Sequence, residues 1–444
     1  MKTPIFDFVK DYAEKKNVRL HMPGHKGRAL LGCEALDITE IDGADSLYSA
    51  DGIIAESENN ATRLFGTAHT FYSTEGSTLS IKTMLALALS GIKKPRVLAA
   101  RGAHKAFIYA AALLDVDVEW VFPAELSSIC SSATVTPEEI ERALDSLEDI
   151  SAVYLTSPDY LGNIADVSAI AKICHKRGIL LLVDNAHGAY LNFLSESRHP
   201  IALGADMCCD SAHKTLPALT GGAYLHISER CGEYVKNAKN TMSIFASTSP
   251  SYLTLISLDL VNSYLECEYR EHLAETVKKT ALLKESIKKN GISVLDTEPL
   301  KIVIDANEYG YTGVDIANCL RSDGIEPEYA DTEYTVLMVS TENTDDDLER
   351  LVSSLSRLPR RSKILRETAV CFTAPERVMS VREAMFSLRE LVLTKEAVGR
   401  ICASPTVSCP PAIPIAVSGE VITDKEIKLF EKYKIEKIEV VKNA

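Results

Sequence analysis

The sequence predicts an α/β fold in which a mainly parallel sheet lies between helices. From about residue 80 to 230, strand-like and helix-like segments alternate regularly. Residues 179–183 read Ile-Leu-Leu-Leu-Val, an apolar run typical of a strand that is buried on both faces. The 444 residues are enough for two or three domains with sizeable cores. Repeated β–α units call for parallel strands with helices on both sides of the sheet.

Each element of this alternation follows from a local pattern. Thr136 is a good N-cap for the helix that starts at Pro137, and Gly178 is a good terminator for the helix before it. In chain order, the patterns predict a helix over 80–90, a strand over 96–100, a helix over 103–114, a strand over 116–122, a helix over 137–147, a strand over 151–156, a helix over 167–177 and strands over 179–183, 205–209 and 223–227.

After residue 250 the pattern changes. A helical stretch over 251–290 leads to a second alternation over 293–358, which predicts a small α+β domain. Residues 360–363, Arg-Arg-Ser-Lys, form a plausible linker to a C-terminal module. We therefore expect an N-terminal segment over 1–45, a large domain over 46–262, the small domain over 263–360 and a C-terminal domain over 361–444.

The composition is that of a globular protein. Hydrophobic residues make up 46% and charged residues 25%, and 48 Lys+Arg against 62 Asp+Glu give a net charge of −14. A nucleic-acid-binding surface needs positive charge, so we expect no nucleic-acid partner. The sequence has no run of about 18 apolar residues and no apolar stretch of signal-peptide length at its start. We expect no membrane span and a cytoplasmic protein.

The eleven cysteines are scattered and show no CxxC spacing. This pattern indicates neither a metal cluster nor a disulfide framework, and it fits a reducing compartment. The adjacent pair Cys208 and Cys209 lies in an apolar strand, so we interpret both as packing residues.

The most informative motif is Ser211-Ala212-His213-Lys214, which lies between two strand-like runs. A lysine in such a strand–turn–strand, preceded by a hydroxyl and an imidazole, suits an enzyme that holds pyridoxal 5′-phosphate (PLP) as a Schiff base. Lys214 would form the imine, and Ser211 and His213 would meet the phosphate. The alternative is a solvated lysine in a hairpin turn.

Three further side chains suit the cofactor ring. Asp184 directly follows the most apolar strand, where a buried carboxylate needs a partner such as a protonated pyridine nitrogen. Its alternative is to cap a helix. His187 would either hydrogen-bond near the cofactor's O3′ or orient Asp184, and both interpretations stay open. The flat imidazole of His104 could stack on the ring, or it could simply begin a helix.

Hydroxyl-rich helix starts suit the phosphate. Gly76, Ser77 and Thr78 open a helix, where backbone N–H groups and hydroxyls bind a dianion well. Ser247 and Thr248 precede another helix and could contribute in the same way. Simple helix capping is the alternative at both places.

These segments together resemble the Orn/Lys/Arg decarboxylase family of fold-type-I PLP enzymes, in its short form without an N-terminal regulatory domain. The resemblance runs from about residue 18 to 425. It rests on His21-Met22-Pro23-Gly24-His25-Lys26-Gly27, Gly76-Ser77-Thr78, Arg101–Lys105, Thr156-Ser157-Pro158, Asp184–Gly188, Ser211–Leu216, Ser247–Tyr252, Ala397–Arg400, Pro410–Pro414 and Gly419-Glu420.

The resemblance implies a large PLP-binding domain with a mainly parallel sheet of the seven-stranded type. It implies decarboxylation of arginine, lysine or ornithine to an amine used in polyamine biosynthesis. It also implies a homodimer or larger assembly with shared active sites, in which residues 247–252 reach the neighbouring subunit's cofactor. The carboxylate that reads the basic substrate is not identified, and the candidates are Glu40, Asp42, Asp45 and Glu420.

Three positions depart from the family pattern. Asn185 stands where a glutamate is expected, and Cys409 and Ala412 replace an aromatic residue and a glycine. Asn185 lies near the cofactor and keeps other reactions open. An aminotransferase or lyase on the same scaffold is one alternative, with Arg321 as the candidate carboxylate-binding arginine. A non-catalytic PLP-binding relative is the other.

Overall fold

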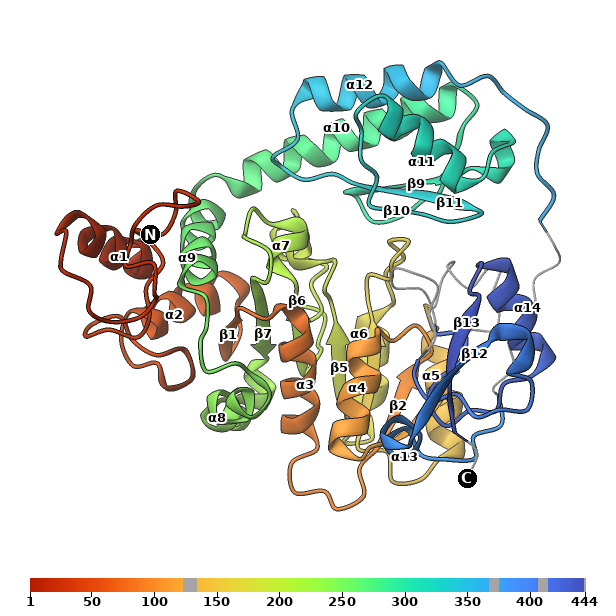
Figure 1. Cartoon of the computed structure of the whole chain (residues 1–444), viewed down its shortest axis with the longest axis horizontal. Coiled ribbons are helices and arrows are strands. Elements are labelled where there is room, and N and C mark those ends of the chain that lie inside the picture. Colours follow the sequence, from red (N-terminus) through yellow and green to blue (C-terminus); the bar gives the residue numbers. More distant parts are fainter. Residues whose placement is uncertain (123–133, 367–374, 406–413, 443–444) are drawn as a thin grey trace. The chain divides into compact units, whose positions relative to one another are not determined.

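The computed structural model describes residues 1–122, 134–366, 375–405 and 414–442, and these residues contain three β-sheets (Figure 1). The chain divides into two compact units. The first unit comprises residues 1–92, 151–153 and 167–272, and the second comprises 93–150, 154–166 and 273–444. The predicted domain boundaries at residues 45, 262 and 360 stay predictions.

The largest sheet has seven strands in the order β1-β7-β6-β5-β4-β2-β3. β2 pairs with β3 and β5 with β6 in parallel, while β7 runs antiparallel to both β1 and β6. The predicted α/β fold with a mainly parallel sheet is confirmed. The strands are β1 (His69–Ser73), β2 (Arg96–Ala100), β3 (Asp117–Val121), β4 (Ala152–Thr156), β5 (Leu180–Asp184), β6 (Met207–Asp210) and β7 (Ala223–Ile227).

The helices of this part of the chain mostly follow their local signals. Thr136 caps α5 with a full capping box, and Gly178 has a φ of +71° after α6, as its role as terminator requires. The helices are α1 (Pro4–Glu14), α2 (Ile53–Phe65), α3 (Gly76–Ala88), α4 (Lys105–Leu114), α5 (Pro137–Ser146), α6 (Val167–Lys176), α7 (Ala212–Thr215), α8 (Val235–Phe245) and α9 (Tyr252–Cys267).

The long helix expected over 251–290 is wrong in one respect, because it is two helices. α9 ends at Cys267, and α10 (Tyr269–Lys289) follows after Glu268, which leaves the helical conformation with a φ of −125°. α9 packs with α1 and α2 in the first unit, and these three helices lie side by side in Figure 1. Asp259 of α9 accepts hydrogen bonds from the backbone N–H groups of Ile5 and Phe6, which fixes the start of α1.

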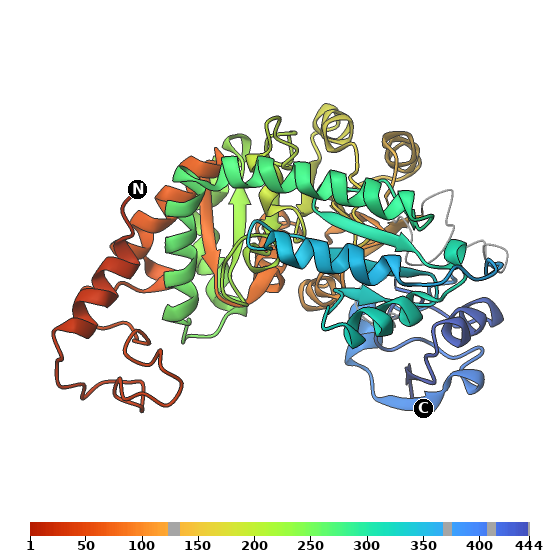
Figure 2. The ribbon, with the colours of Figure 1, turned by 90° about the horizontal axis from the view of Figure 1, so that it is seen from above.

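A second, four-stranded sheet has the order β10-β11-β9-β8, and the helices α10, α11 and α12 cover one of its faces (Figures 1 and 2). The core between them contains Leu283 and Ile287 of α10 and Leu351 and Leu355 of α12. The elements are β8 (Ser293–Val294), β9 (Lys301–Asp305), α11 (Gly313–Ser322), β10 (Tyr329–Ala330), β11 (Tyr334–Met338) and α12 (Asp345–Ser356).

The C-terminal residues form a third, two-stranded sheet. β12 (Arg389–Leu393) and β13 (Lys437–Val441) run antiparallel and share a small apolar core with α14 (Asp424–Lys432). A short helix, α13 (Val381–Phe386), precedes them and packs against α4.

Candidate active site

Lys214 lies on α7, a single helical turn between β6 and β7. The expected turn between the two strands contains a short helix, because the Lys214 N–H donates to the Ser211 carbonyl at 3.1 Å and closes a turn of helix. The side chain is half-buried. Its Nζ atom lies 3.0 Å from Nε2 of His187, so the lysine-bearing segment contacts the segment that follows β5.

Asp184 is the last residue of β5 and is 2% exposed. Its Oδ1 atom accepts hydrogen bonds from the Ala186 N–H at 3.1 Å and from the Cys209 thiol at 3.5 Å. The Ala186 bond is an Asx-type turn that starts the loop carrying His187. The structure thus brings together Asp184, His187 and Lys214 within the first unit, whereas both interpretations of His187 stay predictions.

The first turn of α3 has the features of an anion site. The helix begins at Gly76, earlier than the expected Ser80, and no side chain caps it. Gly76 has a φ of +67°, and its N–H donates to the Gly221 carbonyl at 2.8 Å, which ties α3 to the lysine-bearing loop. The Ser211 hydroxyl donates to the Ser77 hydroxyl at 2.9 Å. Two predicted phosphate ligands, 134 positions apart in sequence, therefore touch.

His213 supports the same loop. Its backbone N–H and its Nδ1 both contact the Gly222 carbonyl, at 3.1 and 2.9 Å. Burial lowers the pKa of His213, with a further contribution from the Lys214 charge, so the ring is neutral at neutral pH. Because a carbonyl only accepts, Nδ1 carries the proton and Nε2 is the remaining acceptor. The predicted contact of His213 with the phosphate stays a prediction.

Ser247 and Thr248 are exposed, and the segment is attached to the start of α3. The Ser247 N–H donates to Oε1 of Glu75 at 2.7 Å, and Glu75 directly precedes Gly76. Thr78 lies half-buried in the first turn of α3. Their contacts with phosphate also stay predictions.

His104 belongs to the second unit, where it is the N-cap of α4. Its Nδ1 accepts a hydrogen bond from the Ala106 N–H at 3.2 Å. The capping alternative weighed for His104 is therefore present in the structure. Its stacking on a cofactor ring stays a prediction.

Sequence reasoning missed a buried ion pair between Arg101 and Glu420. Both side chains are almost fully buried, and Glu420 accepts from Nη1 at 2.6 Å and from Nη2 at 2.8 Å. The guanidinium also lies 5.2 Å from the ring centroids of Trp120 and Phe122. The partners are 319 positions apart, so no local pattern could have paired them. Since the Glu420 carboxylate already binds Arg101, Glu420 is no longer a candidate for binding the basic side chain of the substrate.

Asp45, a second candidate for binding the basic substrate, also has a structural role. Asp45 accepts from the N–H groups of Gly52 and Ile54, at 2.9 Å each, and thus holds the start of α2. Glu40 and Asp42 remain as candidates for reading a basic substrate.

The adjacent cysteines are fully buried, and burial raises the pKa values of both Cys208 and Cys209 well above the ordinary thiol value. Both side chains are fully buried, as their interpretation as packing residues requires. The two departures at Cys409 and Ala412 lie outside the described residues.

A family model described as Orn/Lys/Arg decarboxylase, major domain, matches residues 3–305. The chain belongs to the Orn/Lys/Arg decarboxylase family. It is a PLP-dependent amino-acid decarboxylase, and the resemblance noted from its motifs is confirmed.

Curated relatives cover nearly the whole chain. Arginine decarboxylase of Halalkalibacterium halodurans is 30% identical over 96% of this chain and 92% of its own length. Arginine decarboxylase of Bacillus subtilis is also 30% identical, over 97% and 93%. Among solved structures, a Francisella novicida lysine decarboxylase superposes with a TM-score of 0.81 at 16% identity, over 99% of this chain and 81% of that one. Such low identity shows the shared fold alone.

No helix in the part of the chain that the structure describes is long and apolar enough to cross a membrane.

Proposed function

We propose that this decarboxylase acts on arginine and releases carbon dioxide and the corresponding amine, a polyamine precursor. The substrate choice rests on the two relatives named arginine decarboxylase, each 30% identical over nearly the full chain. The site assignment rests on one observation, the 3.0 Å contact between Lys214 Nζ and His187 Nε2. His187 follows the buried carboxylate of Asp184 by three residues.

The residues present fit PLP. An α-helix start without a side-chain cap leaves backbone N–H groups for an anion, and α3 begins in this way beside the Ser77–Ser211 hydroxyl pair. We assign the phosphate to this start, with Gly76 and Thr78 beside the two serines, and with His213, Ser247 and Thr248 as further contacts. Asp184 would hold the ring nitrogen, and its negative charge would keep that nitrogen protonated. His104 would stack on the ring.

When bound, PLP supplies an electron sink for the electron pair left as the Cα–carboxylate bond breaks. The protein's own groups control the protons. The Lys214 amine and the His187 imidazole lie at hydrogen-bond distance, 3.0 Å, so one group could pass a proton to the other. This position beside the amine favours a role of His187 near O3′ over a role in orienting Asp184.

The aminotransferase alternative depended on Arg321 as a site for the substrate carboxylate. Its Nε atom donates to Glu326 at 2.7 Å, and the side chain is 43% exposed on α11. An arginine that already binds an acid at the surface is a poor carboxylate receptor. No observation favours that reaction over decarboxylation.

The test is carbon dioxide release from purified protein loaded with PLP and offered arginine, lysine and ornithine separately. We expect release from arginine at a kcat/KM at least about tenfold above that for the other two. Release from lysine or ornithine instead would correct the substrate and keep the reaction. Silence with all three amino acids, from protein that binds PLP, would contradict the proposal.

We also propose that the active enzyme is a homodimer or a larger homo-oligomer with shared sites. Leu20, Met22, Leu30 and Leu31 each expose more than 70% of their side chains around the His21–Gly27 motif. Covering such side chains stabilises association. Sedimentation at micromolar concentration should give a dimer or larger species, and a monomer with full activity would contradict this.

A further inference from the structure

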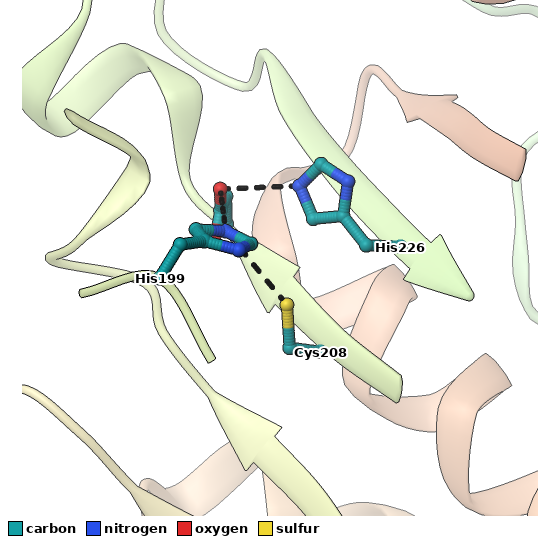
Figure 3. Close-up of side chains that lie close together, drawn as sticks. His199, Cys208 and His226 are labelled. Carbon is teal, nitrogen blue, oxygen red and sulfur yellow. Dashed lines mark hydrogen bonds and ion pairs between the residues drawn. The ribbon is translucent and has the colours of Figure 1, made fainter. Parts of the chain in front are cut away.

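A buried polar cluster consists of Cys208 and Asp210 of β6, His226 of β7 and His199. The proposed chemistry assigns no role to this cluster. The four ligand-type atoms all lie within 4.8 Å of one another. His199 Nε2 and His226 Nε2 each approach Oδ2 of Asp210 at 3.1 Å. Figure 3 shows the two imidazoles and the Cys208 thiol turned toward a common point.

Hydrogen bonds account for this cluster. A carboxylate only accepts, so each imidazole presents an Nε2–H to Oδ2, and the Thr70 hydroxyl can then donate to Nδ1 of His226 at 2.9 Å. Burial alone raises the pKa of Asp210, but the adjacent His199 and His226 hold it below its ordinary value. Burial raises the pKa of the Cys208 thiol, which therefore stays protonated.

The second oxygen of Asp210 binds Asn185, which departs from the family pattern. The Asn185 Nδ2 donates to Oδ1 of Asp210 at 2.6 Å, and both side chains are 0% exposed. The backbone N–H of Asn185 also donates to the Cys209 carbonyl at 2.9 Å. The residue after Asp184 is thus bonded to two consecutive residues at the end of β6.

An ionised acidic side chain at position 185 could not donate this hydrogen bond to Asp210. A carboxylate facing Asp210 at this fully buried position would place two like charges at hydrogen-bond distance. The amide supplies a donor instead, and its oxygen lies against Gly188, where any Cβ would collide with it. Only the orientation with the NH₂ group toward Asp210 satisfies the carboxylate.

These bonds connect the two segments of the proposed site. Asp184 directly precedes Asn185, and Ser211 directly follows Asp210, three residues before Lys214. We propose that Asn185 and Asp210 are positioning residues whose hydrogen bond, backed by His199 and His226, fixes the carboxylate of Asp184 relative to the amine of Lys214. This inference rests on the proposed function, because it assumes that both groups bind PLP.

The test is a reciprocal exchange of the two side chains. The variants are Asn185→Asp, Asp210→Asn and the double variant, and the readouts are the Kd for PLP and the visible absorption band of bound PLP without substrate. Each single variant should weaken PLP binding by about tenfold, because the pair becomes two acids or two amides. The double variant restores one acid and one amide, so its Kd should return to within about threefold of the wild type.

The matched control is Asp206→Asn. Asp206 is equally buried and directly precedes β6, whose last residue is Asp210. Its side chain contacts His175 at 3.0 Å and the Leu181 N–H at 2.8 Å. Its replacement should lower the unfolding midpoint and leave the Kd for PLP within about twofold. This control distinguishes weaker PLP binding that results from a less stable protein from weaker binding that results from displacement of Asp184 relative to Lys214.

Either of two results on PLP binding would overturn the positioning role. One is wild-type PLP binding in both single variants, and the other is a double variant whose loss equals the sum of the single losses. A stoichiometric zinc ion in the purified protein would also overturn it, since the metal would then hold Asp210. If wild-type protein shows no visible PLP band, or Lys214→Ala keeps that band, the proposed function fails instead.

Discussion

Arg101 and Lys214 are two basic residues that follow strands of the same sheet, yet they meet different partners. Arg101 is 0% exposed and donates two hydrogen bonds to Glu420 and one, at 3.2 Å, to the Pro414 carbonyl. Lys214 is half-buried, and its amine contacts the imidazole of His187. A guanidinium bound to a carboxylate keeps its charge, whereas an amine beside an imidazole can gain or lose a proton.

The difference teaches how to separate structure from chemistry at a strand end. A fixed charge with fixed partners stabilises packing, as the Arg101–Glu420 pair does. An amine beside an imidazole, as at Lys214 and His187, is suited to proton transfer, and the amine itself is suited to covalent bonding. The variants below test this contrast, because one class should lose stability and the other should lose turnover.

The largest effect is expected at Lys214. Lys214→Ala removes the amine that attaches the cofactor, so the visible PLP band should disappear and kcat/KM should fall by more than about a thousandfold. Spectra of PLP-loaded protein and carbon dioxide release measure the two losses. The unfolding midpoint of the protein without cofactor should hardly change. Lys236→Ala, at an exposed lysine of α8, should behave like wild type in every assay.

Asp184→Asn should lower kcat by about a hundredfold or more while the fold persists. An amide still accepts the hydrogen bond from the Ala186 N–H, but it cannot hold a protonated ring nitrogen by charge. Steady-state kinetics and circular dichroism check the two halves of this prediction. Near-wild-type turnover would mean that another residue holds the ring.

Glu420→Gln should act on stability rather than on chemistry. It leaves the guanidinium of Arg101 buried without a counter-charge, which costs about 3–5 kcal/mol of unfolding free energy. Combining it with Arg101→Met removes both charges and should recover most of that loss. Urea unfolding curves of both variants measure the difference. A loss below about 1 kcal/mol in the single variant would place this pair among those that contribute little.

Much of the fold follows from local patterns, and so does the list of chemical groups. The apolar run before Asp184, the cap at Thr136 and the hydroxyls at Ser77 are each visible within a few positions. What the sequence could not supply is long-range pairing. Arg101 with Glu420 and Asn185 with Asp210 are partners only because the sheet brings them together. Asn185 departs from the family pattern in the sequence, but only the structure shows that its amide donates to Asp210.

Strand β1 and the helix boundary at Glu268 escaped prediction for a related reason. The β1 residues His69–Ser73 mix polar and aromatic side chains, and their pairing with β7 gives them their strand conformation. Glu268 lies inside a continuous helix-forming sequence and carries no glycine or proline signal. The structure shows both features, and no turn or terminator signal in the sequence marks either of them.

The smallest effect is expected at Asp259, a buried carboxylate whose contacts are unlike those of Glu420. It accepts from the N–H groups of Ile5 and Phe6 and from the Ser57 hydroxyl, and burial raises its pKa to about 6. Because this folded-state pKa lies above the ordinary carboxyl value of 3.8, the folded protein binds the proton more tightly than the unfolded chain. The stability contributed by the protonated group is present below pH 4 and is lost as the pH rises through 6.

Asp259→Asn should remove this pH dependence, because an amide keeps an acceptor for the α1 backbone without a charge. The wild type should lose up to about 3 kcal/mol of unfolding free energy at this residue between pH 4 and 7, relative to the variant. Urea unfolding of both proteins across that range measures the difference. Parallel pH profiles would mean that the hydrogen bonds from Ile5, Phe6 and Ser57 compensate the buried charge fully. The neutral donors around Asp259 would then stabilise a buried carboxylate as well as the Arg101 guanidinium stabilises Glu420. The difference between a cation and neutral donors would no longer explain how the two carboxylates affect stability.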